Sequence, residues 1–253
     1  MTKLRILLGV GAVVALGVWV AGSAADVRGN VPICSSPGVQ IAPGTYRNLT
    51  ITGNAYVAKG STVTVTGNLT LTPGSCLDAF DVGAVVNVSR NVLVGPGAVL
   101  ALGCTPTSNF AFEPCEGVAT SSRVGGSIIA AGAYTMYLDG DVVGGNVISL
   151  GGGPGLGGPY TNFPIKDNTI GGDLIVLGWH GAWAGAIRNT VGGNLIFSGN
   201  QSVQDPDANE VQTNTVQGNL ICVANSPAAH VNPVDGGQPN TVAGHKIGQC
   251  AGL

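Results

Sequence analysis

Four stretches of this chain repeat almost the same line, and this repetition limits the folds that the chain can adopt. They read NTIGGDLIVLGW at residues 168–179, NTVGGNLIFSGN at 189–200, NTVQGNLICVAN at 214–225 and NTVAGHKIGQCA at 240–251. Repeats of roughly 20 to 50 residues are typical of stacked arrays, because one repeat is too small to bury its own apolar face. The sequence therefore predicts a solenoid in which each line forms one coil.

The same period extends through the chain when the polar residue before each short apolar segment is taken as a reference. We call this position the first ladder; it is occupied by Asn48, Asn68, Asn91, Ser127, Asn146, Asp173, Asn194, Asn219 and His245. A glycine precedes the reference residue in seven of these nine cases. The segments that follow, such as LTI, LIV and LIF, are short and rich in β-branched residues, which favours strands over helices.

A second polar position lies five residues before the first in six of the coils. This second ladder contains Ser122, Asp141, Asn168, Asn189, Asn214 and Asn240. Polar side chains at a constant offset predict amides that stack coil on coil and form hydrogen bonds along the rod. Replacing Asn194 with leucine is therefore expected to destabilise the fold without touching an active site.

About nine coils of this kind predict an all-β protein, a right-handed parallel β-helix or β-solenoid. Most coils span 19 to 27 residues, which disfavours the left-handed hexapeptide helix with its strict six-residue rhythm. Alternation with threonine predicts that Leu49 and Leu69 face inward. Three successive apolar residues leave the direction of Ile175, Ile196 and Ile221 open, because a strand covered on both faces has the same pattern.

The recurring NTVxGNL line resembles secreted actinobacterial proteins of the right-handed parallel β-helix kind, whose fold is that of the pectate lyases. The resemblance covers most of the chain after the leader. It implies the fold, and it implies little about activity because that group is largely uncharacterised. Pectate-lyase chemistry uses clustered acidic calcium ligands and a basic proton acceptor, and this sequence offers no matching set of residues. No catalytic residue is carried over.

Residues 1–25 have the layout of a signal peptide that export removes. Lys3 and Arg5 provide a positive start, residues 6–20 are apolar and uncharged, and small residues follow at 21–25. A retained membrane anchor is the alternative, since about 20 apolar residues can span a bilayer. The prediction is a secreted or cell-surface protein with one β-helix domain at 26–253, of which 26–47 form an N-terminal cap region.

Six cysteines in an exported chain predict disulfides, because paired metal-binding spacings are missing from the sequence. Cys104 and Cys115 both lie in one insertion, so we expect them to pair. Adjacent final coils would bring Cys222 to Cys250, which leaves Cys34 for Cys76, and these are all the cysteines in the chain.

Charged residues are too sparse to indicate a reaction or a nucleic-acid partner. They make up 9 per cent of the chain, the net charge is −3, and no basic run follows the leader. Asp139 and Asp141 lie two apart, would share a face on a strand and could act as an acid pair. Ladder duty is nevertheless the preferred interpretation for Asp141, as it is for Asp173. The acidic stretch with Asp205, Asp207 and Glu210 could bind calcium, although it lacks known calcium-loop patterns. We expect no cofactor, metal or catalytic residue, and no membrane contact after leader removal.

One loop, GWHGAWAGAIRN at residues 178–189, carries the most suggestive group of side chains. Trp179, His180, Trp183 and Arg188 form the candidate ligand surface, because exposed indoles stack on sugar rings. The preferred interpretation, however, is that both tryptophans fill the glycine-rich loop against the rod.

These patterns favour a non-enzymatic β-helix with a structural, surface or glycan-binding role, and an extracellular polysaccharide as the candidate partner. The alternative is a polysaccharide lyase or glycoside hydrolase of the same fold. An acid pair with a basic residue in one groove would favour the enzyme. A bare flank with aligned threonines, asparagines and aromatic residues would favour binding. The sequence leaves the oligomeric state open.

Overall fold

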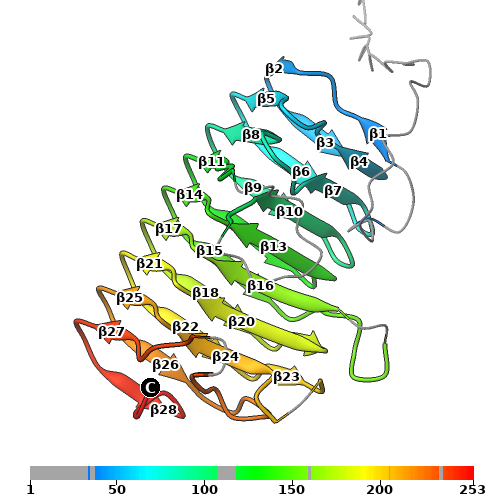
Figure 1. Cartoon of the computed structure of the whole chain (residues 1–253). Coiled ribbons are helices and arrows are strands. Elements are labelled where there is room, and N and C mark those ends of the chain that lie inside the picture. Colours follow the sequence, from blue (N-terminus) through cyan, green and yellow to red (C-terminus); the bar gives the residue numbers. More distant parts are fainter. Residues whose placement is uncertain (1–33, 35–37, 107–117, 159–160, 205, 234–235) are drawn as a thin grey trace, which may run out of the picture.

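The computed structural model describes residues 34, 38–106, 118–158, 161–204, 206–233 and 236–253. Within these residues every regular element is a β-strand, and the strands stack from the blue end of the chain to the red end (Figure 1). This part of the chain contains no helix with the length and apolar character needed to cross a membrane. The leader predicted at residues 1–25 lies outside the described residues.

Three parallel sheets, called A, B and C, form the faces of the solenoid. In spatial order, sheet A contains β1 (Val39–Gln40), β4 (Asn54–Tyr56), β7 (Cys76–Ala79), β10 (Val99–Gly103), β13 (Thr135–Asp139), β16 (Asn162–Lys166), β20 (Trp183–Ile187) and β24 (Asn209–Gln212). Sheet B contains β2 (Gly44–Tyr46), β5 (Thr62–Val65), β8 (Val85–Val88), β11 (Arg123–Val124), β14 (Val142–Val143), β17 (Thr169–Ile170), β21 (Thr190–Val191), β25 (Thr215–Val216) and β27 (Thr241–Val242). Sheet C contains β3 (Leu49–Ile51), β6 (Leu69–Leu71), β9 (Val92–Val94), β12 (Ile128–Ala131), β15 (Val147–Leu150), β18 (Leu174–Leu177), β22 (Leu195–Ser198), β26 (Leu220–Cys222) and β28 (Lys246–Gly248). A separate parallel pair is formed by β19 (His180–Gly181) and β23 (Gln201–Ser202).

The chain visits the sheets in the order A, B and C and then begins the next coil, so each strand pairs with the equivalent strand one coil away. The nine strands of sheet C correspond to nine passes of the chain, or about eight complete turns. The predicted parallel β-solenoid is therefore confirmed. Residues 38–47 of the predicted cap region supply the first strands of sheets A and B.

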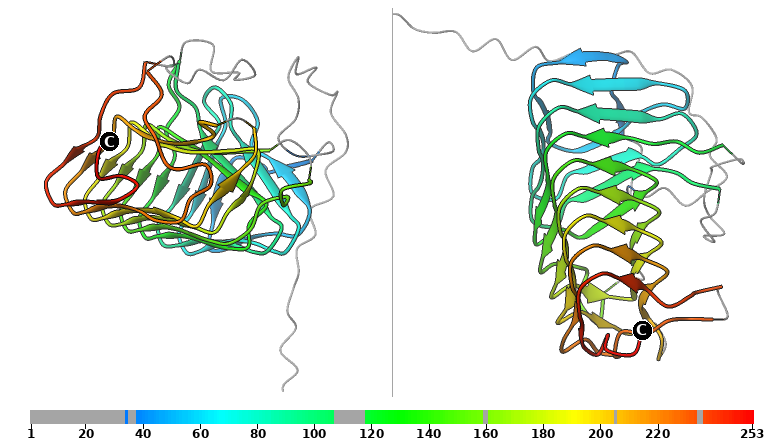
Figure 2. Two further views of the ribbon diagram at one scale, coloured as in Figure 1. Left: turned by 90° about the horizontal axis from the view of Figure 1, so that it is seen from below. Right: turned by 90° about the vertical axis from the view of Figure 1, so that its left-hand side faces the viewer.

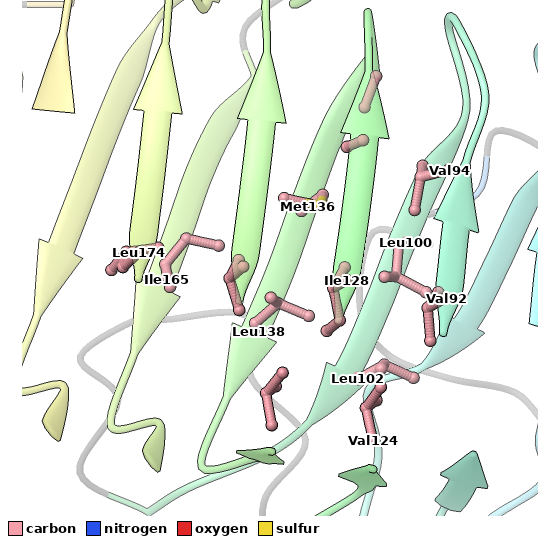
Figure 3. Packing of buried hydrophobic residues seen from close by; sticks show 14 of the residues in the cluster. Val92, Val94, Leu100, Leu102, Val124, Ile128, Met136, Leu138, Ile165 and Leu174 are labelled. Carbon is pink, nitrogen blue, oxygen red and sulfur yellow. The ribbon is translucent and has the colours of Figure 1, made fainter. Parts of the chain in front are cut away.

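The apolar core lies between the three sheets, and each coil contributes inward side chains to it. Leu100 and Leu102 enter from sheet A, Val124 from sheet B and Ile128 from sheet C (Figure 3). Each of these side chains can bury its apolar area only because the coils above and below supply the remaining contacts. The outer positions of sheet C answer the question that the sequence left open: Ile175, Ile196 and Ile221 alternate with fully buried residues, are partly exposed and therefore face outward.

The first ladder runs along the corner between sheets B and C. The side-chain Oδ1 of Asn194 accepts hydrogen bonds from the backbone N of Asn219 at 2.9 Å and from its Nδ2 at 3.1 Å. Asn194 in turn donates through N and Nδ2 to Oδ1 of Asp173 in the preceding coil, at 2.6 and 3.1 Å. The same backbone-to-side-chain contact joins every successive pair in the series from Asn48 to His245.

The second ladder runs along the corner between sheets A and B, and it is more deeply buried. Asn189 Oδ1 accepts from N and Nδ2 of Asn168, and Asn189 donates in the same way to Asn214. Its Nδ2 also donates to the carbonyl oxygen of Ile165 in sheet A at 2.8 Å. The acceptor oxygens of this ladder point to the preceding coil, whereas those of the first ladder point to the following coil.

A third ladder, which the sequence reasoning missed, occupies the corner between sheets C and A in the last coils. Asn200 donates through N and Nδ2 to Asn225 Oδ1, and Asn225 donates in the same way to Gln249 Oε1. The sequence does contain the pattern that predicts this ladder, because Asn200 and Asn225 each follow their first-ladder residue by six positions. All three corners of these coils therefore use side-chain amides to satisfy backbone groups.

The glycines of the repeat are required by the close approach of successive coils. A Cβ at Gly192 would collide with the carbonyl oxygen of Gly171 in the preceding coil. A Cβ at Gly193 would collide with Oδ1 of Asp173, the oxygen that accepts the first-ladder hydrogen bond. The GG pair before the reference residue therefore follows from backbone stacking on backbone, and the second glycine leaves room for the ladder side chain.

We expect Gly192→Ala to lower the free energy of unfolding by about 1–3 kcal/mol, because the new methyl group meets a backbone carbonyl that cannot rotate away. Thermal unfolding followed by circular dichroism measures the change. Gly53→Ala is the matched control, since a Cβ there has no neighbour within 4 Å. Equal melting temperatures for the two variants would contradict the stacking explanation.

Two predicted disulfides are present in the structure. Cys34 is bonded to Cys76, and Cys222 is bonded to Cys250. Cys104 is also disulfide-bonded, but its predicted partner Cys115 lies outside the described residues. Two disulfides are consistent with an extracellular location, because such bonds persist in oxidising compartments.

Candidate functional site

Trp179 of the candidate ligand surface is a core residue. Its side chain is fully buried, its ring lies 5.5 Å from that of Phe163, and its Nε1 donates to the carbonyl oxygen of Tyr134 at 3.1 Å. Gly181 makes room for it, because a Cβ there would enter the indole ring. Trp179 therefore offers no ring face for ligand stacking, and the preferred interpretation that it packs against the rod is correct for this residue.

Trp183 points to the opposite side of the chain, onto the outer face of sheet A. Its ring lies across Gly185, and Lys166 Nζ from the neighbouring strand stands 5.2 Å from the ring centroid. Such a cation–π contact stabilises a lysine that has lost part of its water. Both residues are buried, at 7 and 5 per cent exposure, so this indole also lacks the open ring face that sugar stacking needs.

Glu210 on β24 is the polar partner of Trp183 and belongs to the same buried layer. Its Oε1 accepts from Trp183 Nε1 at 3.1 Å, and its Oε2 accepts from Gln212 Nε2 at 3.0 Å. The sequence groups Glu210 with Asp205 and Asp207 as a candidate calcium site. Oδ2 of Asp207 lies 3.7 Å from Nε2 of His230, and Asp205 lies outside the described residues. In the described part of the chain, no three His, Cys, Asp or Glu side chains are grouped so that they could hold a metal ion.

Arg188 and His180 lie in different parts of the coil. Arg188 follows β20 at the corner toward sheet B and forms a bidentate ion pair with Asp167, at 2.7 Å from Nε and 2.6 Å from the second guanidinium nitrogen. Both residues have a positive φ, at 55° and 58°, so the pair joins equivalent turns of two adjacent coils. His180 is partly buried and stands on β19, in the separate two-stranded sheet. The four residues therefore do not form one surface.

Asp139 takes no part in either ladder and lies on a different face from Asp141, which corrects the expectation that the two carboxylates share a face. It ends β13 on the outer face of sheet A and is 2 per cent exposed. Its Oδ1 accepts from Thr105 Oγ1 at 2.7 Å, and its strand partner in the next coil is Lys166. Gly140, with φ 79°, turns the chain between the two aspartates, so they do not share a face as residues two apart on a strand would.

Asp141 is a member of the second ladder, as the sequence predicts. Its Oδ1 accepts from the backbone N of Ser122 at 2.8 Å, while its Oδ2 has no hydrogen-bond partner among the described residues. Burial raises the pKa of the Asp141 carboxyl well above its usual value; the bond from Ser122 lowers it and the charge of Asp139 raises it further. Burial therefore favours the neutral acid. Its hydroxyl group stands at the ladder position where the following coils have the amide NH2 group of an asparagine.

The connecting segments explain why the outer face of sheet A is closed. Thr105 contacts Asp139, Ala208 packs on Trp183, and Asn232 donates to Glu210 at 3.4 Å. The described parts of the long connections project from one side of the stack (Figure 2). The sequence therefore places carboxylates and a lysine next to each other on this face, but the fold uses them to attach loops.

Sheet B, in contrast, has one outward residue in each of its last, two-residue strands, and these residues are aligned from coil to coil. Threonine occupies this position in the last four described coils, and each of the four side chains is exposed: Thr169, Thr190, Thr215 and Thr241. We call this set the threonine column. Within the described residues, none of these hydroxyls has a hydrogen-bond partner. Glycines at 171 and 192 follow two of the threonines and leave the backbone beside the column uncovered.

Comparison of the chain with protein families, with curated proteins and with solved structures finds no match. The structure bears out the fold that the resemblance implies, a parallel β-solenoid.

Proposed function

We propose that this protein is an exported, non-enzymatic scaffold that binds an extracellular polysaccharide along the threonine column of sheet B. The observation that supports this most is the alignment of four exposed threonines in consecutive coils. Adjacent strands lie about 4.8 Å apart, so the hydroxyls form a row with a constant period. A polymer with regularly repeated hydroxyl groups is the ligand class that such a row suits.

The chemistry of the row agrees with a neutral polymer. Each threonine hydroxyl can donate one hydrogen bond and accept two, as can the hydroxyls of a sugar. None of the four β-strands that carry the column contains a charged residue. Each contact is weak, and binding therefore depends on several coils engaging one chain at once.

Export is part of the proposal, and two features support it. The first 25 residues have the composition of a cleavable leader, and two disulfides join coils at the two ends of the described chain. A mature N-terminus near Asp26 in secreted protein, found by mass spectrometry, is the expected result. Intact protein that begins at Met1 in membrane fractions would contradict it.

We expect the double variant Thr190→Ala/Thr215→Ala to bind its polysaccharide at least about fivefold more weakly, since it loses two hydrogen bonds of about 0.5–1.5 kcal/mol each. A polysaccharide array identifies the ligand for wild-type protein, and titration calorimetry then compares the variants. Circular dichroism should remain unchanged, because both side chains point into solvent.

The double variant Thr50→Ala/Thr70→Ala makes the same chemical change on the outer face of sheet C and should bind like wild type. If both double variants lose affinity equally, the threonine column is not the binding face. If wild-type protein retains no polysaccharide on the array, the proposed function itself fails.

One observation favours a second candidate function, that of a polysaccharide lyase or hydrolase. Asp139 and Lys166 are neighbours across a strand pair, with Asp141 two residues away, which is the acid and base combination that such chemistry uses. All three are buried, at 2, 5 and 1 per cent exposure, and a substrate would have to displace the covering segments. Release of unsaturated or reducing sugars by wild-type protein, lost in Asp139→Asn, would establish this alternative; we expect no product.

A further inference from the structure

The outer face of sheet C carries a continuous column of aliphatic side chains. It begins at Leu93, continues through Ile129 and four further isoleucines in register, and ends at Ile247. Leu93, Ile129 and Ile247 are exposed by 37, 37 and 43 per cent. We call this set the isoleucine column. In an ordinary solenoid coil these outward positions would be polar, as they are in β3 and β6, where Thr50 and Thr70 occupy the same row.

A second row of apolar side chains widens the column into a patch. Leu150 and Leu177 stand two residues further along their strands and pair with each other, and Leu150 is 47 per cent exposed. Val223, just beyond β26, adds a further apolar side chain at 49 per cent exposure. Contiguous apolar surface larger than a few hundred Å² marks an interaction site.

The face also lacks the devices that keep exposed sheets apart. The only charged residue in the nine strands of sheet C is Lys246, which pairs with the inward Leu220 and so stands at the start of its strand, outside the column. Exposed sheets that remain monomeric usually carry lysine or other charges among their outward residues. This surface has the composition of an interface.

We propose that a second copy of this chain covers sheet C, so that the protein forms a symmetric dimer. Nine strands, each about 4.8 Å wide and about 13 Å long on this face, give roughly 560 Å² per copy, or roughly 1,100 Å² for two. A specific interface needs about 1,000 Å² in total. The area is therefore sufficient for a weak dimer.

Periodicity argues for a second copy over an unrelated partner. Both surfaces then have the same coil spacing, so the side chains of one column can fit between those of the other along the whole length. Packed sheets lie about 10 Å apart, which the two layers of isoleucine and leucine side chains fill. A two-fold axis that lies in the plane of the interface, runs across the coils and passes next to Ile175 places Leu93 of one copy opposite Ile247 of the other.

Sedimentation of the secreted protein over a range of concentrations tests the proposal. Wild-type protein should shift from monomer to dimer as its concentration rises. Ile175→Lys/Ile196→Lys should weaken the dimer at least about 100-fold, because it buries unpaired ammonium groups at the centre of the interface. Thr190→Lys/Thr215→Lys adds the same charges on sheet B and should dimerise like wild type. A wild-type protein that stays monomeric throughout would overturn the proposal, as would equal loss in both variants.

Cysteine cross-linking tests the symmetry without depending on the folding of the lysine variant. Under mild oxidation Ile175→Cys should give a disulfide-linked dimer, because each copy presents this residue to itself across the axis. Leu93→Cys should not, since its counterpart is Ile247. Equal cross-linking of the two variants, or none in Ile175→Cys, would refute the two-fold arrangement. Polysaccharide binding through sheet B is a separate measurement and is expected to persist in monomeric variants.

Discussion

Replacing Asn189 with leucine is expected to lower the free energy of unfolding by at least about 3 kcal/mol, because it leaves several buried polar groups without partners at about 1–3 kcal/mol each. Asn168 would lose the acceptor for its N and Nδ2, and Asn214 Oδ1 would lose one of its two donors. The carbonyl oxygen of Ile165 would lose the bond from Asn189 Nδ2. Urea unfolding monitored by circular dichroism measures the loss.

Two variants calibrate this result. Asn194→Leu removes the equivalent residue of the first ladder, which is only partly buried, and should cost less because water can replace the lost partners. Thr190→Leu places the same side chain one position after Asn189 on an exposed site and should change stability by less than about 0.5 kcal/mol. A loss in Asn189→Leu no greater than that in Asn194→Leu would show that burial does not set the strength of a ladder.

Asp141→Asn is expected to stabilise the protein at neutral pH and to have little effect in acid. The pKa of this carboxyl is raised in the folded protein, chiefly by burial. Below the unfolded pKa of about 4 both states hold the proton, so the aspartate costs nothing there. Above it the unfolded chain releases the proton while the folded protein retains it, and stability falls until the pH passes the folded pKa.

The size of the gain follows from the same linkage. Each unit by which the pKa is raised corresponds to about 1.4 kcal/mol at a pH above both values. In the next coil, Nδ2 of Asn168 donates hydrogen bonds to Leu138 O and Asn189 Oδ1. An asparagine at position 141 would supply the equivalent donor in its own coil. Wild-type protein and variant should therefore have different unfolding curves at pH 7 and the same curve at pH 3.

Asp173→Asn is the matched control for this prediction. It makes the same substitution in the first ladder, where the carboxylate is partly exposed and Oδ1 already accepts two hydrogen bonds from Asn194. Its stability should change little. If Asp141→Asn destabilises the protein at pH 7, the carboxylate form must be bound in the fold, and the neutral-acid interpretation is wrong.

The sequence was sufficient to predict the features that repeat from coil to coil. The positions of Asn194 and Asn189 in two ladders could be read directly, because a solenoid converts a constant offset in sequence into a column in space. The Cys222–Cys250 bond followed from the same logic, since the two residues fall in adjacent coils. Glycine before the ladder residue was visible as a pattern, but its cause required the distance between stacked backbones.

The features that do not repeat could not be read in this way. Trp179 and Trp183 lie four residues apart, yet one enters the core and the other the outer face of sheet A, because a corner and the short strand β19 separate them. Asp139 and Asp141 diverge at Gly140 for the same kind of reason. The burial of Lys166 and Glu210 depends on connecting segments whose lengths differ from coil to coil, and periodicity contains no information about them.

The positions of the two observed disulfides affect how the solenoid unfolds. In a stack where each coil touches only its neighbours, unfolding starts at an end and peels inward, because an end coil has one contact surface instead of two. Cys34–Cys76 ties the segment before the first described strand to β7, and Cys222–Cys250 ties the final turn to β26. A protease in the surrounding medium would therefore meet a rod whose two fraying points are covalently closed, and opening either end would require several coils to separate together.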